Sequence, residues 1–348
     1  MLLTILSFIF VFTVITLAHE FGHLVFAKRA GIAVPEFGLG FGPTIFSFSK
    51  NNTTYKINIL PILGYVKIAG LDADEDQDKE IPEDQKFFNK KTSQKFMPIF
   101  AGALMNLILG FLVFSFTFMI IGVPIGISNE LSAISPGSEA AKVGLKSGDR
   151  LLAINGKEYS DPEEAVKTIH ENPDIELTLS IDRAGKKILI KATPKLNKKM
   201  KIGLIGFSLK AIYEKVGPLT AIYKGFLQTA SLSLMILTLV GKLLTGGISL
   251  FDLAGPVGIA QITGQYASHG VLSLLSFLAF FSVNVAVLNL LPIPALDGGR
   301  LFFVLIEAIR HKAIPLELEN KFHYVGLFAL LGLLAVLTVN DLIRILAK

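Results

Sequence analysis

Two histidines and a glutamate lie close together near the start of the chain, in the pattern H-E-x-x-H, at His19, Glu20 and His23. On a helix, residues four apart lie on the same face, so both imidazoles can reach one metal ion. Glu20 lies about 100° further around the helix, a position that suits a general base acting on a metal-activated water. The pattern therefore indicates a metal-dependent hydrolase.

The setting of this pattern is a long apolar segment. Residues 1–18 carry no charged side chain, and after Glu20 the apolar run continues to Ala27 before Lys28 and Arg29. About 20 apolar residues span the hydrocarbon core of a bilayer as a helix, so we expect a transmembrane helix at about 3–27. Ionisable side chains inside such a helix are costly and usually functional.

A catalytic zinc site needs a third protein ligand in addition to two histidines. The chain has no Cys, so the ligand must be a His, Asp or Glu. Spacing alone leaves three alternatives in or near the apolar segments: Asp252, His269 and Asp297. Asp297 follows a segment with two prolines and precedes Gly298-Gly299, which is typical of an unwound segment lining a cavity.

The composition indicates a membrane protein. Of 348 residues, 51% are hydrophobic and 18% are charged, and a formal charge of +5 in so apolar a chain marks cytoplasmic loop ends more than a nucleic-acid surface. Three further spans are expected, at about 97–121, 271–296 and 324–340. A fifth apolar segment, 222–244, is long enough to span but is ambiguous, because Lys224 and Lys242 lie near its two ends and Gly225 and Gly241 bound its core.

The segments between the spans predict two β-rich regions. Residues 36–68 form a β-hairpin around Asn51-Asn52, followed by a loop with eight carboxylates at 72–84 that we interpret as solvated. Residues 128–210 are richer in charge and glycine and predict a small soluble α+β domain. A helix begins there at Asp161-Pro162, and a strand pair turns at Ala184-Gly185.

On these motifs the chain resembles the site-2 protease family of intramembrane zinc metalloproteases, in its bacterial RseP type with one PDZ domain. The family pairs H-E-x-x-H in the first span with N-x-x-P-x-P-x-L-D-G at the end of the third, which here is Asn289–Gly298. Further matches are the glycine-rich run 37–42, the run 64–67, and Ala101-Gly102 through Asn106. The inserted region 135–156 follows the bacterial PDZ pattern.

The resemblance implies Zn2+ bound by His19, His23 and Asp297, with Glu20 activating water. It also implies substrates that are single-pass membrane proteins, such as an anti-sigma factor or a remnant signal peptide. The predicted fold is a polytopic α-helical membrane protein with about four transmembrane helices, a membrane-associated β-hairpin and one inserted α+β PDZ domain. We place Asn289 and Asn284 in substrate binding, because an amide can hold an unwound peptide backbone.

For His19 and Asp297 to meet at one ion, the first and third spans must run parallel. Residues 222–244 then lie in the interface or re-enter the membrane. The expected organisation is two spans with the β-loop at 1–127, PDZ at 128–210, an interfacial or re-entrant segment at 211–270, and two spans at 271–348. Basic residues then gather on one side, which the positive-inside rule makes cytoplasmic, with the PDZ domain extracytoplasmic in a bacterial inner membrane.

The predicted function is zinc-dependent endopeptidase cleavage of transmembrane segments, with the lipid bilayer and membrane-protein substrates as partners and no nucleic acid. The alternative is a polytopic transporter or channel with a regulatory PDZ module, in which the ionisable residues would form a proton or metal path. The sequence shows no repeat between its two halves of the kind found in many transporters, which argues against this alternative.

Overall fold

The computed structural model describes residues 1–71, 80–197, 201–312 and 314–346. The chain forms two compact units, one made of Met1–Ile120 with Gly217–Lys348 and the other of Ile121–Val216. Five of the eight carboxylates of the predicted acidic loop, within 72–79, lie outside the described residues.

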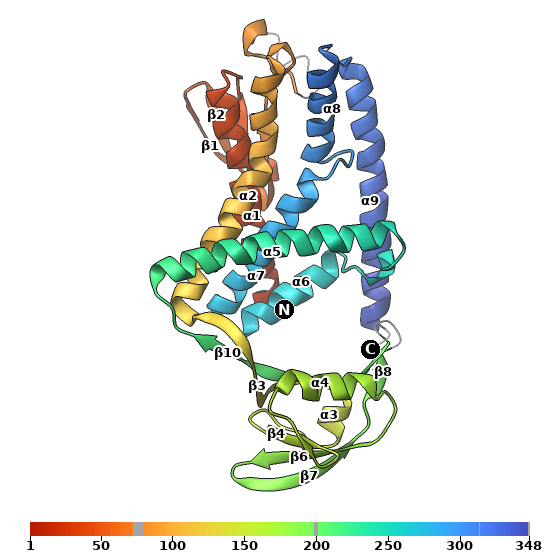
Figure 1. Cartoon of the computed structure of the whole chain (residues 1–348). Helices are drawn as coiled ribbons and strands as arrows, with labels where there is room; N and C mark the ends of the chain where they lie inside the picture. Colours follow the sequence, from red (N-terminus) through yellow and green to blue (C-terminus); the bar gives the residue numbers. More distant parts are fainter. Residues whose placement is uncertain (72–79, 198–200, 313, 347–348) are drawn as a thin grey trace. The chain divides into compact units, whose positions relative to one another are not determined.

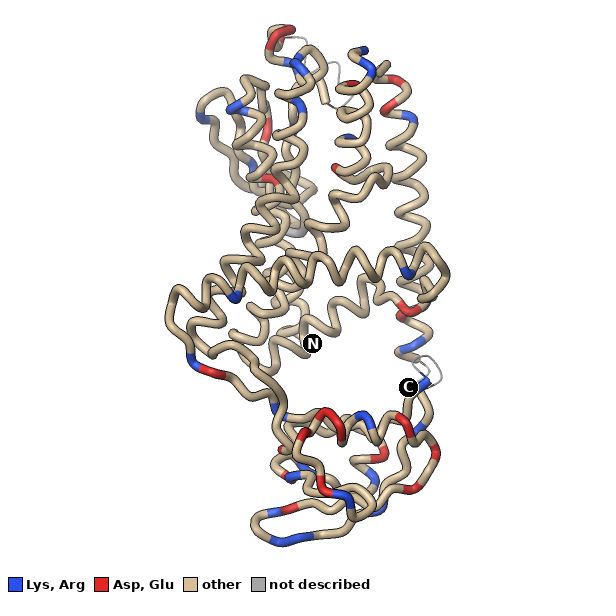
Figure 2. Tube along the Cα trace, in the orientation of Figure 1, with Lys and Arg blue, Asp and Glu red and all other residues tan. Residues whose placement is uncertain are grey.

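The first unit is built from apolar helices (Figure 1). They are α1 (Leu2–Arg29), α2 (Thr92–Ile121), α5 (Pro218–Leu244), α6 (Pro256–Ser268), α7 (Val271–Leu290), α8 (Asp297–Arg310) and α9 (Leu316–Leu346), with short 3-10 turns η1 (Glu83–Gln85), η2 (Phe87–Asn89) and η3 (Leu250–Asp252). Charged residues gather toward the ends of this unit and leave the middle of α2, α7 and α9 free of charge (Figure 2). This pattern is that of helices that cross a bilayer.

Among the described residues, five helices are long and apolar enough to span a membrane: α1, α2, α5, α7 and α9. The four predicted spans fall on α1, α2, α7 and α9, so the expected class of polytopic membrane protein is confirmed. Figure 1 shows α5 lying across α2 and α7 rather than alongside them. The orientation of α5 therefore differs from that of α2 and α7.

The structure differs from the prediction where the third span ends. We expected one span over 271–296 with Asp297 at its C-terminal end, but α7 ends at Leu290 and Asp297 begins a separate helix, α8. Proline lacks an N–H and disfavours helical geometry in the residue before it. Pro292 and Pro294 therefore replace the expected end of the helix with an irregular turn.

The β-region of this unit is more elaborate than a hairpin. Strand β1 (Glu36–Lys50) and strand β2 (Thr53–Lys67) join at Asn51-Asn52, whose φ values of 51° and 57° suit a tight hairpin turn. Both strands bend, so residues 36–39 pair on one edge with 54–57 and on the other with 64–67. The outer segments of the resulting sheet are 44–50 and 64–67.

The second unit is an α+β fold, as predicted. Its sheet has the order β10-β3-β4-β6-β7 with β5 paired to β4. The strands are β3 (Val123–Ile134), β4 (Arg150–Ile154), β5 (Lys157–Glu158), β6 (Leu177–Arg183), β7 (Lys186–Ala192) and β10 (Phe207–Glu214), accompanied by the pair β8 (Lys195–Asn197) and β9 (Ile202–Leu204) and by helices α3 (Glu139–Lys142) and α4 (Pro162–Glu171). Asp161 caps α4 as expected, accepting a hydrogen bond from Glu163 N at 2.8 Å.

An ion pair with a buried carboxylate connects the turn before β4 of this unit to β6. The carboxylate of Asp149, which is 1% exposed, accepts hydrogen bonds from Arg183 at 2.7 and 2.8 Å and from the backbone N–H of Lys146 at 2.8 Å. The Arg183 guanidinium holds the pKa of Asp149 below its usual range. The carboxylate therefore stays ionised at neutral pH and stabilises the fold there.

Candidate metal centre

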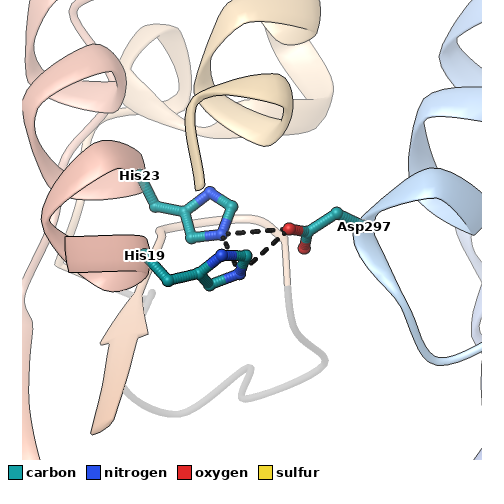
Figure 3. Close-up of side chains that lie close together, drawn as sticks. All are labelled: His19, His23 and Asp297. Carbon is teal, nitrogen blue, oxygen red and sulfur yellow. Dashed lines mark hydrogen bonds and ion pairs between the residues drawn. The ribbon is translucent and has the colours of Figure 1, made fainter. Parts of the chain in front are cut away.

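The two histidines of the H-E-x-x-H motif and Asp297 come together from opposite ends of the chain. Figure 3 shows His19 and His23 projecting from one face of α1 toward the first residue of α8. The Nε2 atoms of His19 and His23 lie 3.1 Å and 3.4 Å from Asp297 Oδ2, and 3.2 Å from each other. Among the described residues this is the group of His, Asp and Glu that can hold a metal ion.

The separations of these three atoms fit a tetrahedral zinc ion. Zinc binds imidazole nitrogen and carboxylate oxygen at about 2.0–2.2 Å, so two ligands of a tetrahedral site lie roughly 3.3 Å apart. The observed separations of 3.1–3.4 Å match that value. Asp297 Oδ2 is also buried without a hydrogen-bond partner within the described part of the chain. A buried carboxylate oxygen of this kind is explained by a cation.

Helix α2 supplies the second contact of each imidazole. The carbonyl of Pro98 lies 2.7 Å from His23 Nδ1. A carbonyl only accepts, so Nδ1 carries the hydrogen and Nε2 presents its lone pair toward Asp297. This is the arrangement that orients a metal-binding histidine.

For His19 the corresponding neighbour is Asn106, which is fully buried and has its Nδ2 3.3 Å from His19 Nδ1. Its Oδ1 has no hydrogen-bond partner among the described residues. A rotation of the amide group by 180° exchanges its oxygen and nitrogen, and the hydrogen-bond network decides which of the two faces His19. With Oδ1 turned to a protonated His19 Nδ1, the amide oxygen is satisfied and His19 Nε2 is free to bind a metal.

Small residues bring α1 and α2 close enough for these contacts. A Cβ on Gly22 would lie 2.2 Å from the carbonyl oxygen of Ala101, and a Cβ on Gly102 would lie 2.4 Å from His23 Nε2. The first clash is with backbone, and the second could be relieved only by moving the imidazoles of His23 and His19 away from their positions in the site. The two glycines are therefore required for the helix contact that forms the site.

The three residues open onto a cavity of about 210 Å³, which Glu20 also lines. Val66 and Ile68, at the end of β2 and just beyond it, form part of its wall, and Arg300 lies there one helical turn after Asp297. Arg300 also donates a hydrogen bond to the carbonyl of Leu71 at 2.9 Å. The cavity thus combines a group of three side chains that can hold a metal ion, a further carboxylate and the end of a strand.

The sequence-predicted residues separate into two groups. His19, Glu20, His23 and Asp297 share the cavity, whereas Asn284 and Asn289 are not among its lining residues. Asn284 donates its amide to Phe280 O in its own helix at 3.0 Å. The rival ligand candidates lie elsewhere: Asp252 is in η3, and His269 Nδ1 bonds Gln265 O at the end of α6.

Three features of the site were missed from the sequence. Two of them are the contacts of Pro98 and Asn106 with the imidazoles. They connect α2 to α1 across a long stretch of sequence, so no local sequence pattern predicts them. Arg300 could have been found, because three residues after Asp297 on a helix places it on the same face.

Comparison with known proteins decides the family. The family model described as Peptidase family M50 matches residues 7–333. The chain belongs to peptidase family M50. Relatives are similar over their whole lengths: "Regulator of sigma-W protease RasP" of Bacillus subtilis is 35% identical, covering 98% of this chain and 99% of that protein. "Zinc metalloprotease RasP" of Bacillus licheniformis is 34% identical with the same coverage.

A solved structure of the PDZ domain of an SdrC-like protein from Listeria monocytogenes is 22% identical to this chain. The match covers 24% of this chain and 86% of that one, with a TM-score of 0.22, which is too low to establish a shared fold.

Membership of the M50 family confirms the predicted activity. The chain is a metalloendopeptidase of the site-2 protease type that acts within the membrane, and the transporter alternative is not favoured. The names of its relatives imply zinc. Its substrates are membrane proteins in a lipid bilayer, as the M50 family implies.

Proposed function

We propose that this M50 peptidase binds one zinc ion through His19, His23 and Asp297 and uses Glu20 as its general base. The observation that carries the proposal is the convergence of two imidazole nitrogens and one carboxylate oxygen, each 3.1–3.4 Å from the others, beside a fourth ionisable group in one cavity. Three protein ligands leave one position open, as catalytic zinc sites require.

The protein's own residues then account for the proton transfers of hydrolysis. Bound zinc supplies a Lewis acid that polarises a carbonyl and makes a neighbouring water more acidic at neutral pH. Glu20 accepts one proton from the water as the water oxygen bonds to the scissile carbonyl carbon. Glu20 then donates that proton to the amide nitrogen as the carbon–nitrogen bond breaks, giving a carboxylic acid and an amine.

We further propose that the substrate, a single-pass membrane protein, lies at the site as an extended strand. The hairpin at about 43–60 could offer one edge for it, but the pairing of β2 supports residues 64–67 as the edge that receives it. No other strand pairs with the second edge of 64–67 within the described ranges, and Val66 lines the cavity beside Glu20. Unpaired strand edges bind extended peptides readily.

The role of Asn289 and Asn284 in substrate binding remains a prediction. Asn289 is half-buried in α7, eight residues before Asp297, and its amide would have to contact the unwound peptide at the rim of the cavity rather than inside it. Cleavage by an Asn289→Ala variant with normal zinc content tests this role. Cleavage by this variant at the wild-type rate would show that the Asn289 amide only contributes to helix packing.

The membrane topology that we propose places the metal centre nearer the cytoplasmic side. Basic residues cluster at the end of the helical unit reached by α1 and α8, among them Lys28, Arg29 and Arg310 (Figure 2). The positive-inside rule makes that end cytoplasmic in the bacterial inner membrane and the PDZ-like unit extracytoplasmic.

Cysteine labelling tests this topology, because the chain has no native Cys. If α5 lies in the interface, single cysteines at Lys215 and Ser249, on either side of it, will both react with a membrane-impermeant reagent from the extracytoplasmic side. A cysteine at Lys28 serves as the control and will react only after the membrane is opened. Labelling of Lys215 and Ser249 from opposite sides would show that α5 crosses the bilayer.

The proposed function is tested by metal removal. We expect the purified full-length chain in proteoliposomes to cleave a model single-pass membrane protein, to lose cleavage after chelation, and to regain it with Zn2+ but not with Mg2+. The imidazole ligands account for this selectivity, because Mg2+ prefers oxygen. Cleavage that persists in metal-depleted protein would refute the proposal.

A further inference from the structure

The turn between α7 and α8 determines where the Asp297 carboxylate lies. Two of its backbone hydrogen bonds join residues only two or three apart in the chain: Ile293 N to Leu291 O at 2.6 Å and Leu296 N to Ile293 O at 3.3 Å. Ala295, two residues before Asp297, has a φ of 70°. This left-handed conformation is sterically unfavourable for a residue with a Cβ, so it needs support from the surroundings.

That support comes from α9, at the residue that adopts the unfavourable conformation. His323 Nδ1 accepts a hydrogen bond from the backbone N–H of Ala295 at 3.0 Å. The α9 backbone also approaches the turn closely, because a Cβ on Gly326 would lie 2.0 Å from Pro294 Cβ. His323 in turn lies beside α8, where a Cβ on Gly299 would be 3.2 Å from its Cε1.

The rest of α9 gives no reason for a histidine at this position. Only 11% of the residues in its most apolar stretch are buried by the rest of the structure, which is typical of a helix that faces lipid. His323 lies at the border between the charged start of α9 and the apolar run 324–340, and its half-buried imidazole is turned toward Ala295. The neighbouring Tyr324, by contrast, is 57% exposed.

We propose that His323 is a positioning residue for the metal centre: by accepting the Ala295 N–H it holds the turn in its left-handed conformation and so places the Asp297 carboxylate opposite the two imidazoles. The last helix thereby contributes to zinc affinity without contributing a ligand. This inference rests on the proposed function, in which Asp297 is a ligand.

The test is the zinc affinity of the detergent-solubilised full-length protein, measured by competition with a chromophoric chelator. Residues that orient metal ligands typically contribute 10- to 100-fold in affinity. Because His323 acts through the backbone, we expect His323→Ala to weaken zinc binding about 10-fold. His323→Asn should bind nearly as well as the wild type, since Asn Oδ1 can accept the same hydrogen bond. Tyr324→Ala, on the exposed face, is the control and should bind zinc normally.

A second change separates positioning from general stability. Glycine adopts a positive φ without steric cost, so Ala295→Gly should restore most of the affinity lost in His323→Ala. Packing of His323 alone would not be replaced by a glycine on another element. Unaltered zinc affinity in a folded His323→Ala variant, or no recovery in the double variant, would overturn the inference.

The Asp297→Ala variant, measured alongside, separates the role of Asp297 as a ligand from the role of His323 in positioning it. If Asp297→Ala binds zinc normally, the proposed ligand set is wrong and His323 has no ligand to position. If Asp297→Ala loses zinc while His323→Ala does not, the ligand set stands and the role of His323 is refuted.

Discussion

Replacing Glu20 with Gln should abolish cleavage of a membrane substrate while zinc content stays near that of the wild type. A general base typically contributes 10²–10⁴ in rate, and Gln keeps the size of the side chain but cannot accept the proton. Glu20 lines the same cavity as the imidazoles but is not one of the three converging ligands. The cleavage rate of this variant should therefore fall while its zinc content stays unchanged.

Glu317→Gln is the matched control for this experiment. Glu317 is an exposed carboxylate of α9 whose partner is Lys321, one turn further along the helix. Its replacement should leave both cleavage and zinc content unchanged. Substantial cleavage by Glu20→Gln would remove the general-base role from Glu20.

Replacing Asp297 with Ala should lower zinc content as well as rate. Two imidazoles remain in that variant, from His19 and His23, and they come from a single helix, so the ion loses the ligand that closes the site from α8. We expect zinc occupancy to fall well below one under conditions in which the wild type is saturated, because catalytic zinc sites typically rely on three protein ligands. His23→Ala should behave in the same way.

Asp252→Ala serves as the control for Asp297→Ala, because spacing alone made Asp252 a rival ligand. Asp252 lies in η3 and does not belong to the converging group. Metal content is measured on purified protein by atomic emission. Full zinc occupancy in Asp297→Ala would mean that another residue completes the site.

The catalytic helix could be predicted from the sequence because its information is local. The four-residue spacing of His19 and His23 fixes their common face, and the apolar segment around them fixes the span. Asp297 could not be predicted in this way. Spacing left Asp252 and His269 as possible third ligands too, and the resemblance to a family was needed to choose Asp297. The contact depends on how α1 and α8 pack, which no short pattern encodes.

The sequence was least informative where the backbone departs from regular geometry. Pro292 and Pro294 indicated a break, but not that Asp297 would begin a new helix or that α9 would support the turn through His323. The β-region shows the same limit. Alternating residues predicted a hairpin, but not the bending of both strands that lets residues 36–39 pair on both edges and brings Val66 to the cavity.

The central claim is that one zinc ion is held by two imidazoles and one carboxylate in this membrane protein. X-ray absorption spectroscopy of the zinc-loaded Glu20→Gln variant tests it most directly, because that variant should retain the metal without consuming substrate. We expect a four-coordinate zinc with two imidazole nitrogens and with oxygen ligands, all at about 2.0–2.2 Å. A spectrum with three imidazoles, or with oxygen ligands alone, would contradict the account.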